Sequence, residues 1–144
     1  MRIAVTRLDP ELPLPRPQHS DDAGVDLHAR DDVVIPAAGG RALVATGIAI
    51  AVPPGHGGFV LPRSGLALAN GVTCLNAPGL IDAQYRGEVK VLLVNTDPVT
   101  PYAVSRGDRI AQLVVLPVPA IEWDEVDELD DSTRDVAGFG STGR

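Results

Sequence analysis

The sequence predicts an all-β domain made of many short strands and a single short helix. Apolar residues alternate with smaller or polar ones in several short runs, and Gly, Pro or Asn-Asp breakers bound each run. The chain of 144 residues contains 15 Gly and 13 Pro, which favours tight turns over long helices. Aromatic residues make up only 3%, so we expect a core of Val, Ile, Leu and Ala. This pattern is typical of a sandwich, a jelly roll or a barrel.

The individual elements follow from the same alternation and from their breakers. Strands are expected around residues 3–5, 33–35, 48–52, 59–61, 72–75, 89–94 and 110–118. Residues 12–17 contain three prolines and are expected to form an extended connector. The one helical segment is 65–70, with Ser64 as its cap and Gly71 as its stop.

The composition changes after Pro119. Residues 124–131 carry six carboxylates in eight positions, and residues 132–144 are small, polar and glycine-containing apart from Phe139. We therefore expect a core over 1–119, an acidic linker over 120–131 and a C-terminal arm over 132–144. The plainer alternative is a solvated linker that leads to a frayed end. Trp123 is expected to pack between subunits or against the sheet.

Charge and cysteine content narrow the range of functions. The net charge is −7 and no Lys/Arg cluster occurs, which argues against nucleic acid as a partner. A polyanionic ligand would have to be small, and would be met by a few cations and a metal ion. Cys74 is the only cysteine, which excludes an intrachain disulfide and fits the cytoplasm. The sequence shows no membrane-length apolar run and no signal-peptide layout, and His19, His28 and His56 have no metal-ligand spacing.

The first candidate site is the Pro62-Arg63-Ser64-Gly65 segment, where a strand meets the helix. A helix N-terminus presents unpaired N–H groups that favour a phosphate. Arg63 adds a fork of donors, Ser64 adds a hydroxyl, and Gly65 allows close approach to the backbone. The alternative is an ordinary capped turn with a surface arginine.

The second candidate site is the segment 76–88, where turns at 78–79 and 87 suggest a hairpin. Open backbone groups of such a hairpin would read the edge of a nucleobase. Asp82 lies between apolar residues, so we expect a partly dry carboxylate that can deprotonate a water. Tyr85 offers a ring to a sugar or base. The alternative is a polar loop with a satisfied Asp and a half-buried Tyr.

Polar groups also occur at two further strand starts and in the tail. Asp26 would hold metal-bound water, and Gln112 would bond a phosphate oxygen. Asp108 and Arg109 are expected to form a structural ion pair. The glycine-rich run 138–143 carries hydroxyls and would wrap phosphates through its N–H groups.

Five segments, in this order and spacing, resemble the trimeric dUTP pyrophosphatase family. They are residues 23–27, 62–65, 76–88, 107–113 and 134–143. The resemblance implies a jelly-roll or β-clip-like subunit, a homotrimer, and active sites at subunit interfaces that a flexible C-terminal arm of a neighbour closes. It also implies Mg²⁺-dependent hydrolysis of dUTP to dUMP and pyrophosphate, which limits uracil incorporation into DNA and supplies dUMP.

The resemblance further implies a role for individual residues. Asp82 would activate the attacking water, and Asp26 would act on water bound to Mg²⁺ without touching the metal. Tyr85 would stack under the deoxyribose and exclude a 2′-hydroxyl, while the narrow hairpin would exclude thymine's methyl group. The substrate-binding residues would be Arg63, Ser64, Gly65, Asn76, Leu80, Ile81, Tyr85, Lys90, Gln112, Arg134, Phe139, Ser141 and Thr142.

The arm departs from the family pattern at two positions. Asp135 and Ala137 stand where the family commonly has glycine, and their Cβ atoms restrict positive φ angles. Two other functions remain open from the sequence. One is a dCTP deaminase-type enzyme, which would want an acid at the base, and Glu88 is the only extra glutamate near the hairpin. The other is a non-catalytic dUTPase-like binding protein.

Overall fold

A computed structural model describes residues 1–131. Four of the expected substrate-binding residues, Arg134, Phe139, Ser141 and Thr142, lie outside the described residues. The elements are β1 (Ala4–Arg7), β2 (Val25–His28), β3 (Val33–Ile35), β4 (Arg41–Ala51), β5 (His56–Leu61), α1 (Ser64–Asn70), β6 (Val72–Cys74), β7 (Gly79–Ile81), β8 (Glu88–Asn95), β9 (Tyr102–Val104) and β10 (Arg109–Pro117).

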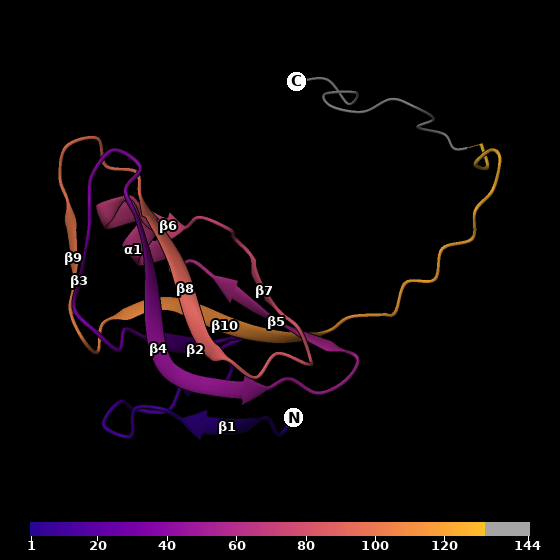
Figure 1. The fold of residues 1–144 in the computed structure, drawn as a ribbon, viewed down its shortest axis with the longest axis horizontal. Helices are drawn as coiled ribbons and strands as arrows, with labels where there is room; N and C mark the ends of the chain where they lie inside the picture. Colours follow the sequence, from indigo (N-terminus) through magenta and orange to yellow (C-terminus); the bar gives the residue numbers. More distant parts are fainter. Residues whose placement is uncertain (132–144) are drawn as a thin grey trace.

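The strands form two four-stranded antiparallel sheets and one small ribbon (Figure 1). One sheet has the order β1-β4-β8-β6, the other has the order β2-β10-β5-β7, and β3 pairs with β9. The two larger sheets face each other in a jelly-roll-like arrangement, with α1 as the one helix of the described part (Figure 1). The predicted all-β class with one short helix is confirmed.

The core between the sheets is aliphatic, as the low aromatic content predicts. Its largest fully buried apolar side chains are Leu27, Ile35, Leu93, Ile110, Val52, Val72, Val89, Val91 and Val104. Branched aliphatic side chains pack well on pleated surfaces, so this composition and the strand alternation support the same architecture. Cys74 is also buried, and burial raises the pKa of its thiol to about 11.

Several strands differ from the expectations. The run at 48–52 is the end of the much longer β4, and the three-residue strands β7 and β9 were not expected. The hairpin expected within residues 76–88 is wrong. After the turn at Pro78-Gly79 the chain crosses to the other sheet, where β7 pairs with β5, whereas β8 pairs with β4 and β6.

The helix begins one residue earlier than expected. Arg63 occupies the N-cap position without a side-chain cap hydrogen bond, so Ser64 is the first helical residue and the expected Ser64 cap is wrong. Gly71 ends α1 as predicted, with φ 63° and its N–H donating to the Ala67 carbonyl. Within residues 1–131, no helix has the length and apolar character needed to cross a membrane.

Beyond β10 the described chain is exposed and runs away from the sheets (Figure 1). The side chain of Trp123 is 90% exposed in this chain. The expectation that Trp123 packs against its own sheet is therefore wrong. Packing between subunits stays a prediction.

The ladder between β4 and β8 is broken near the start of β8. The register shifts between Ala45 and Ala49, so the intervening backbone of β4 has no regular ladder partners on β8. Gly47 adopts φ 71° there, and its N–H donates to the Glu88 carboxylate at 2.9 Å. The Thr46 hydroxyl donates to the Val89 carbonyl at 2.6 Å. Side chains thus replace the missing ladder bonds.

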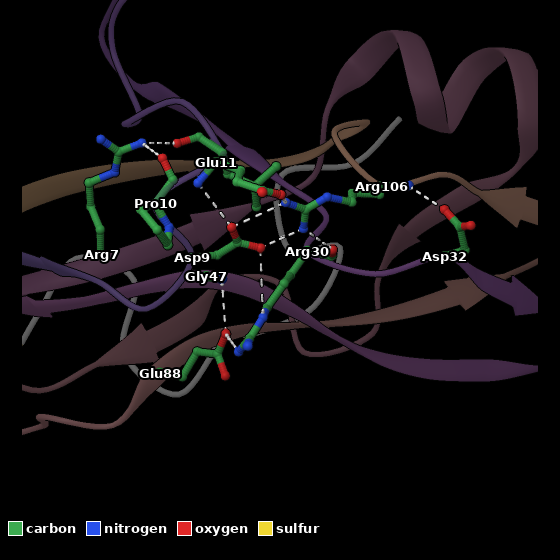
Figure 2. Close-up of polar contacts among 10 residues, drawn as sticks. Arg7, Asp9, Pro10, Glu11, Arg30, Asp32, Gly47, Glu88 and Arg106 are labelled. Atoms are coloured by element: carbon green, nitrogen blue, oxygen red, sulfur yellow. Dashed lines mark hydrogen bonds and ion pairs between the residues drawn. The ribbon is translucent and has the colours of Figure 1, made fainter.

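A network of charged side chains surrounds this break (Figure 2). Arg106 donates from both terminal nitrogens to Asp9, and one of them also lies 3.1 Å from Glu11. Arg30 lies 3.3 Å from Glu88 and 3.9 Å from Asp9. The network therefore ties the loop after β1, the end of β2, the start of β8 and the turn before β10. Hydrogen bonding to Arg106 lowers the pKa of the Asp9 carboxyl from its usual 3.8 to about 2.

We expect the ionisation of Asp9 to make part of the stability depend on pH. Because the folded pKa is below the unfolded one, the stabilisation is complete above about pH 4 and is lost as the pH falls towards 2. Denaturant unfolding should show Asp9→Asn less stable than wild type at pH 7, with the difference narrowing below pH 4. A difference that stays constant as the pH falls through this range would contradict the assignment.

Candidate active site

Three neighbouring strands bring the first group of predicted residues into one row. Gln112 on β10 is in register with Asp26 on β2 and with Leu61 on β5. All three line a pocket of about 400 Å³. The Gln112 side-chain amide donates to the Pro62 carbonyl at 3.0 Å, which fixes its orientation and leaves one N–H and the amide oxygen for other partners.

Two arginines hold the Asp26 carboxylate. Arg63 Nε lies 3.1 Å from one oxygen and Arg109 Nη1 lies 3.1 Å from the other. Arg63 Nη1 also donates to the Arg109 carbonyl at 2.9 Å. The expected pair of Asp108 with Arg109 is wrong, because Arg109 pairs with Asp26 and the Asp108 carboxylate accepts the Ser105 N–H.

His28 lies on β2 two residues from Asp26, so its side chain is on the same face of the strand. Burial lowers the pKa of His28, and the cations of Arg109 and Arg63 lower it further, against an opposing effect of Asp26. The imidazole is therefore neutral at pH 7. The charged groups that act on His28 are the Asp26 carboxylate and the guanidinium groups of Arg63 and Arg109.

The start of α1 provides backbone donors beside this row. Ser64 and Gly65 are exposed at the first turn, where helix N–H groups have no intrahelical partner. A Cβ atom placed on Gly65 would meet nothing within 4 Å. With Arg63 alongside, this turn presents several donors to an anion that approaches the backbone closely.

Sequence reasoning missed part of the pocket around Asp26. Arg16, Gln18 and Asp22 also line it. The Asp22 carboxylate accepts the N–H groups of Gln18 and His19 at 2.9 and 2.8 Å, which folds the connector back over the sheet. The proline-rich connector carries no pattern that would have predicted this position for Arg16.

The second group of predicted residues forms a separate pocket of about 280 Å³. It is lined by Leu80, Ile81, Asp82, Tyr85 and Lys90, together with Leu43 and Val89. The structure thus gathers residues of the 76–88 segment with the exposed outer face of β4 and β8. Leu43 was missed because nothing in its own strand sets it apart. Asp82 is exposed in this chain, so the expected partly dry position is not found here.

Short contacts within the segment fix the ring of Tyr85. Its hydroxyl donates to the Glu88 carbonyl at 2.9 Å, and its N–H donates to the Asp82 carbonyl at 3.0 Å. A Cβ atom on Gly87 would lie 2.5 Å from the Tyr85 hydroxyl oxygen, so the ring occupies the space beside that glycine. The amide of Asn76 similarly lies over Gly79, 3.2 Å from where a Cβ would be.

The two groups line different pockets of the same chain. Strand β5 lies between β10, which carries Gln112, and β7, which leads into Asp82. Among residues 1–131, no group of three or more His, Cys, Asp or Glu side chains is arranged to hold a metal ion. Asp26 has both carboxylate oxygens bonded to arginine, which suits contact with a metal through water and not direct ligation.

Comparison with known proteins identifies the family to which this chain is similar. A sequence model of the dUTPase family matches residues 10–143. A protein of Thermobifida fusca is 59% identical over 143 residues, which cover 99% of this chain and 79% of that protein. A protein of Corynebacterium glutamicum is 58% identical over 142 residues, which cover 99% of this chain and 95% of that protein. Both are named deoxyuridine 5'-triphosphate nucleotidohydrolase.

Solved structures agree on the fold. The G164S variant of the Staphylococcus bacteriophage 80alpha dUTPase, solved with dUpNHpp, is 26% identical with a TM-score of 0.91 over 99% of each chain. A D95N variant of the dUTPase from phage phi11 of S. aureus, described with a structural Mg(II) ion, is 24% identical. It has a TM-score of 0.83, over 91% of this chain and 100% of that one. The resemblance seen in the five sequence segments is confirmed, and the chain belongs to the dUTPase family.

Proposed function

We propose that the chain hydrolyses dUTP to dUMP and pyrophosphate. The observation that carries the proposal is the pairing of two pockets. Arg63, Gly65 and Arg109 line the first, which suits phosphates and is joined to the Gln112 pocket through Asp26, and the second combines a carboxylate, a tyrosine ring and a lysine. Relatives at 58–59% identity bear the name of this activity. The reaction would limit uracil incorporation into DNA and supply dUMP.

The phosphates would bind at the start of α1 and along the adjacent row. The backbone N–H groups of Ser64 and Gly65 have no helical partners, and the space beside Gly65 is open. Arg63 uses its Nε and one Nη1 hydrogen within the protein, which leaves three N–H donors for phosphate oxygens. Gln112 would add its second amide N–H.

Asp82 would activate the water. The water oxygen would bond to the α-phosphorus while the bond from that phosphorus to the bridging oxygen breaks, and pyrophosphate would depart in line. The carboxylate of Asp82 would take the proton from the water. Exclusion of solvent from Asp82 would require a covering group, because the side chain is exposed in the single chain.

The 76–88 segment would select the nucleoside. Tyr85 would stack under the deoxyribose, and its fixed ring would leave no room for a 2′-hydroxyl. Asn76, Leu80 and Ile81 would hold uracil and sugar, and the narrow pocket would exclude thymine's methyl group. Lys90 lines the same pocket and would contact the substrate at its end.

Mg²⁺ is the proposed cofactor. Because the described residues offer no cluster of ligands, the triphosphate and water would hold the ion, with Asp26 accepting from a bound water. The ion would neutralise charge on the triphosphate. The two arginines on Asp26 keep this carboxylate in a fixed position beside Gln112.

The separation of the two pockets supports a homotrimer in which neighbouring subunits complete each site. The phosphate residues of one subunit would face the 76–88 segment of another, and the arm 132–144 would close over a neighbour's site. Arg134, Phe139, Ser141 and Thr142 would act from this arm. The single cysteine is a buried free thiol, which supports the cytoplasm as the place of action.

A dCTP deaminase-type activity is less well supported. That chemistry needs an acid at the base, and Glu88 is the only extra glutamate near the 76–88 segment. Its carboxylate accepts the Gly47 N–H and lies 3.3 Å from Arg30, so it is already engaged inside the fold. A binding protein without catalysis would not require Asp82 in the nucleoside pocket.

The substrate panel tests the proposed function most directly. We expect rapid pyrophosphate release from dUTP with Mg²⁺, and little release from dTTP, dCTP or UTP. EDTA should abolish the release. No release from dUTP would refute the proposal, and ammonia release from dCTP would establish the deaminase instead.

The role of Asp82 predicts a specific loss. Asp82→Asn should lower kcat by at least about a hundredfold, because the water loses its base, and nucleotide binding should persist. Single-turnover kinetics and a dUTP-binding titration would separate the two effects. Asp31→Asn, an exposed carboxylate between β2 and β3, is the control and should retain kcat. Near wild-type turnover in Asp82→Asn would remove this residue from the role.

The arm predicts a different pattern. Deletion of residues 134–144 should remove most of the activity and leave the trimer intact, because all the strands described, up to β10 at Pro117, remain in the shortened chain. Steady-state rates and light scattering would be measured on the same preparation. A truncated chain with full activity would show that the arm is dispensable, and a monomeric one would place the arm in assembly.

A further inference from the structure

We propose that Glu88 is a positioning residue that sets the discrimination between deoxyribose and ribose by holding Tyr85 in place. The inference rests on the proposed function, because it concerns the sugar that Tyr85 would contact. Glu88 does not line the nucleoside pocket. It would act through the ring of Tyr85, and its own anchor is the break in the β4–β8 ladder.

Tyr85 depends on its immediate neighbours for its position. Its side chain is 44% exposed, so burial in the core does not hold it. The ring lies beside Gly87, and its hydroxyl donates to the carbonyl of Glu88 at 2.9 Å. A shift of the Glu88 backbone would therefore move the acceptor that orients the ring.

The backbone of Glu88 lies where the ladder is weakest. Glu88 is the first residue of β8 and pairs with Ala49, on the far side of the register shift from the regular ladder that ends at Ala45. Its side chain compensates for the missing ladder bonds by accepting the Gly47 N–H at 2.9 Å. The side chain of Glu88 is 15% exposed, so this bond is largely shielded from water.

Arg30 contacts the same oxygen of the Glu88 carboxylate that accepts the Gly47 N–H. Its guanidinium lies 3.3 Å from Glu88 Oε1 (Figure 2), and its backbone N–H donates to the Ala45 carbonyl at 2.8 Å. Arg30 is thus fixed to β4 at one edge of the break while its side chain reaches the start of β8. The carboxylate of Glu88 joins β4, β8 and the end of β2 at one point.

Loss of the contacts that the Glu88 carboxylate makes with Gly47 and Arg30 should change the discrimination between dUTP and UTP more than it changes kcat for dUTP. Asp82 directly follows β7, which the ladder with β5 holds independently of the break in β4. Tyr85 lies three residues before Glu88, on the side of the segment that the anchor holds. Loosening the anchor would free the ring before it displaced the carboxylate.

The experiment measures kcat and KM for dUTP and for UTP, together with the melting temperature, on wild type and four variants. Glu88→Ala should lower the ratio of kcat/KM for dUTP over UTP by about tenfold or more, with a smaller change in kcat for dUTP. Glu88→Gln should retain most of the ratio, because its amide oxygen can still accept the Gly47 N–H.

Arg106→Gln is the matched control. Arg106 belongs to the same charged network and contacts Asp9, Glu11 and the backbone carbonyl of Arg30, but it contacts neither Glu88 nor the guanidinium group of Arg30. This variant should lower the melting temperature and keep the ratio. Tyr85→Phe tests the other end of the chain of contacts: it retains the ring, loses the bond to the Glu88 carbonyl, and should lower the ratio even if Glu88→Ala fails to fold.

Three results would overturn the inference. They are a wild-type ratio in Glu88→Ala, a wild-type ratio in Tyr85→Phe, or an equal loss of the ratio in Arg106→Gln, which would indicate general destabilisation. A wild-type protein that hydrolyses dUTP but not UTP, combined with any of these, leaves the proposed function standing. A wild-type protein that does not hydrolyse dUTP overturns both.

Discussion

Between Ala45 and Ala49, strand β4 carries more backbone than β8 can pair with, and the surplus groups need partners from elsewhere. A buried backbone N–H or carbonyl without a partner is costly, so the surrounding side chains are constrained by this break. Glu88, Thr46 and Arg30 meet that need. The start of β8, and with it the 76–88 segment, is located by the same contacts. A break in the regular ladder thereby helps to position the proposed nucleoside pocket.

A second constraint acts at the proposed phosphate site, in the row that contains Asp26 and Gln112. Arg63 and Arg109 converge there, and two guanidinium groups at close range would repel without a shared anion. The Asp26 carboxylate supplies it, with one oxygen to each arginine. Because Arg63 retains three unused N–H donors, the pair with Asp26 holds the arginine in place without consuming its capacity for phosphate. The row is therefore arranged before a ligand arrives, which lowers the cost of binding.

The sequence predicted those features that depend on local patterns. Alternation over 48–52 and 110–118 marks genuine strands, and Gly71 ends the helix because its φ of 63° suits glycine. The three-residue β7 is too short to show a period, and its partner β5 could not be read from the turn that precedes it. The expected ion pair of Asp108 and Arg109 was wrong because it was inferred from their adjacency in the sequence. Consecutive residues entering a strand point to opposite faces, so the partner of Arg109 comes from β2.

The site residues also fall into two groups, those that a local sequence pattern predicts and those that only long-range contacts bring to the site. Arg63, Asp82, Tyr85 and Gln112 stand in segments whose residue types suggest chemistry on their own. The contribution of Glu88 arises from a contact with Gly47, 41 residues away, and from a ladder break that no local pattern reveals. Leu43 and Arg16 likewise reach the pockets only through the folded strands and connector.

The fold separates the two halves of the proposed chemistry, and it does so by sheet order. Gln112 lies on a central strand, flanked by β2 and β5, while Asp82 follows the edge strand β7. The two halves lie on either side of β5 in one chain, and in the proposed trimer a second subunit would present one of them. A neighbouring subunit would then cover three features that are open in the single chain: the exposed Asp82, the exposed Leu80 and the space beside Gly65. In the proposed trimer, assembly would be part of the catalytic mechanism, because it would bring the proposed base to the phosphates and remove that base from water.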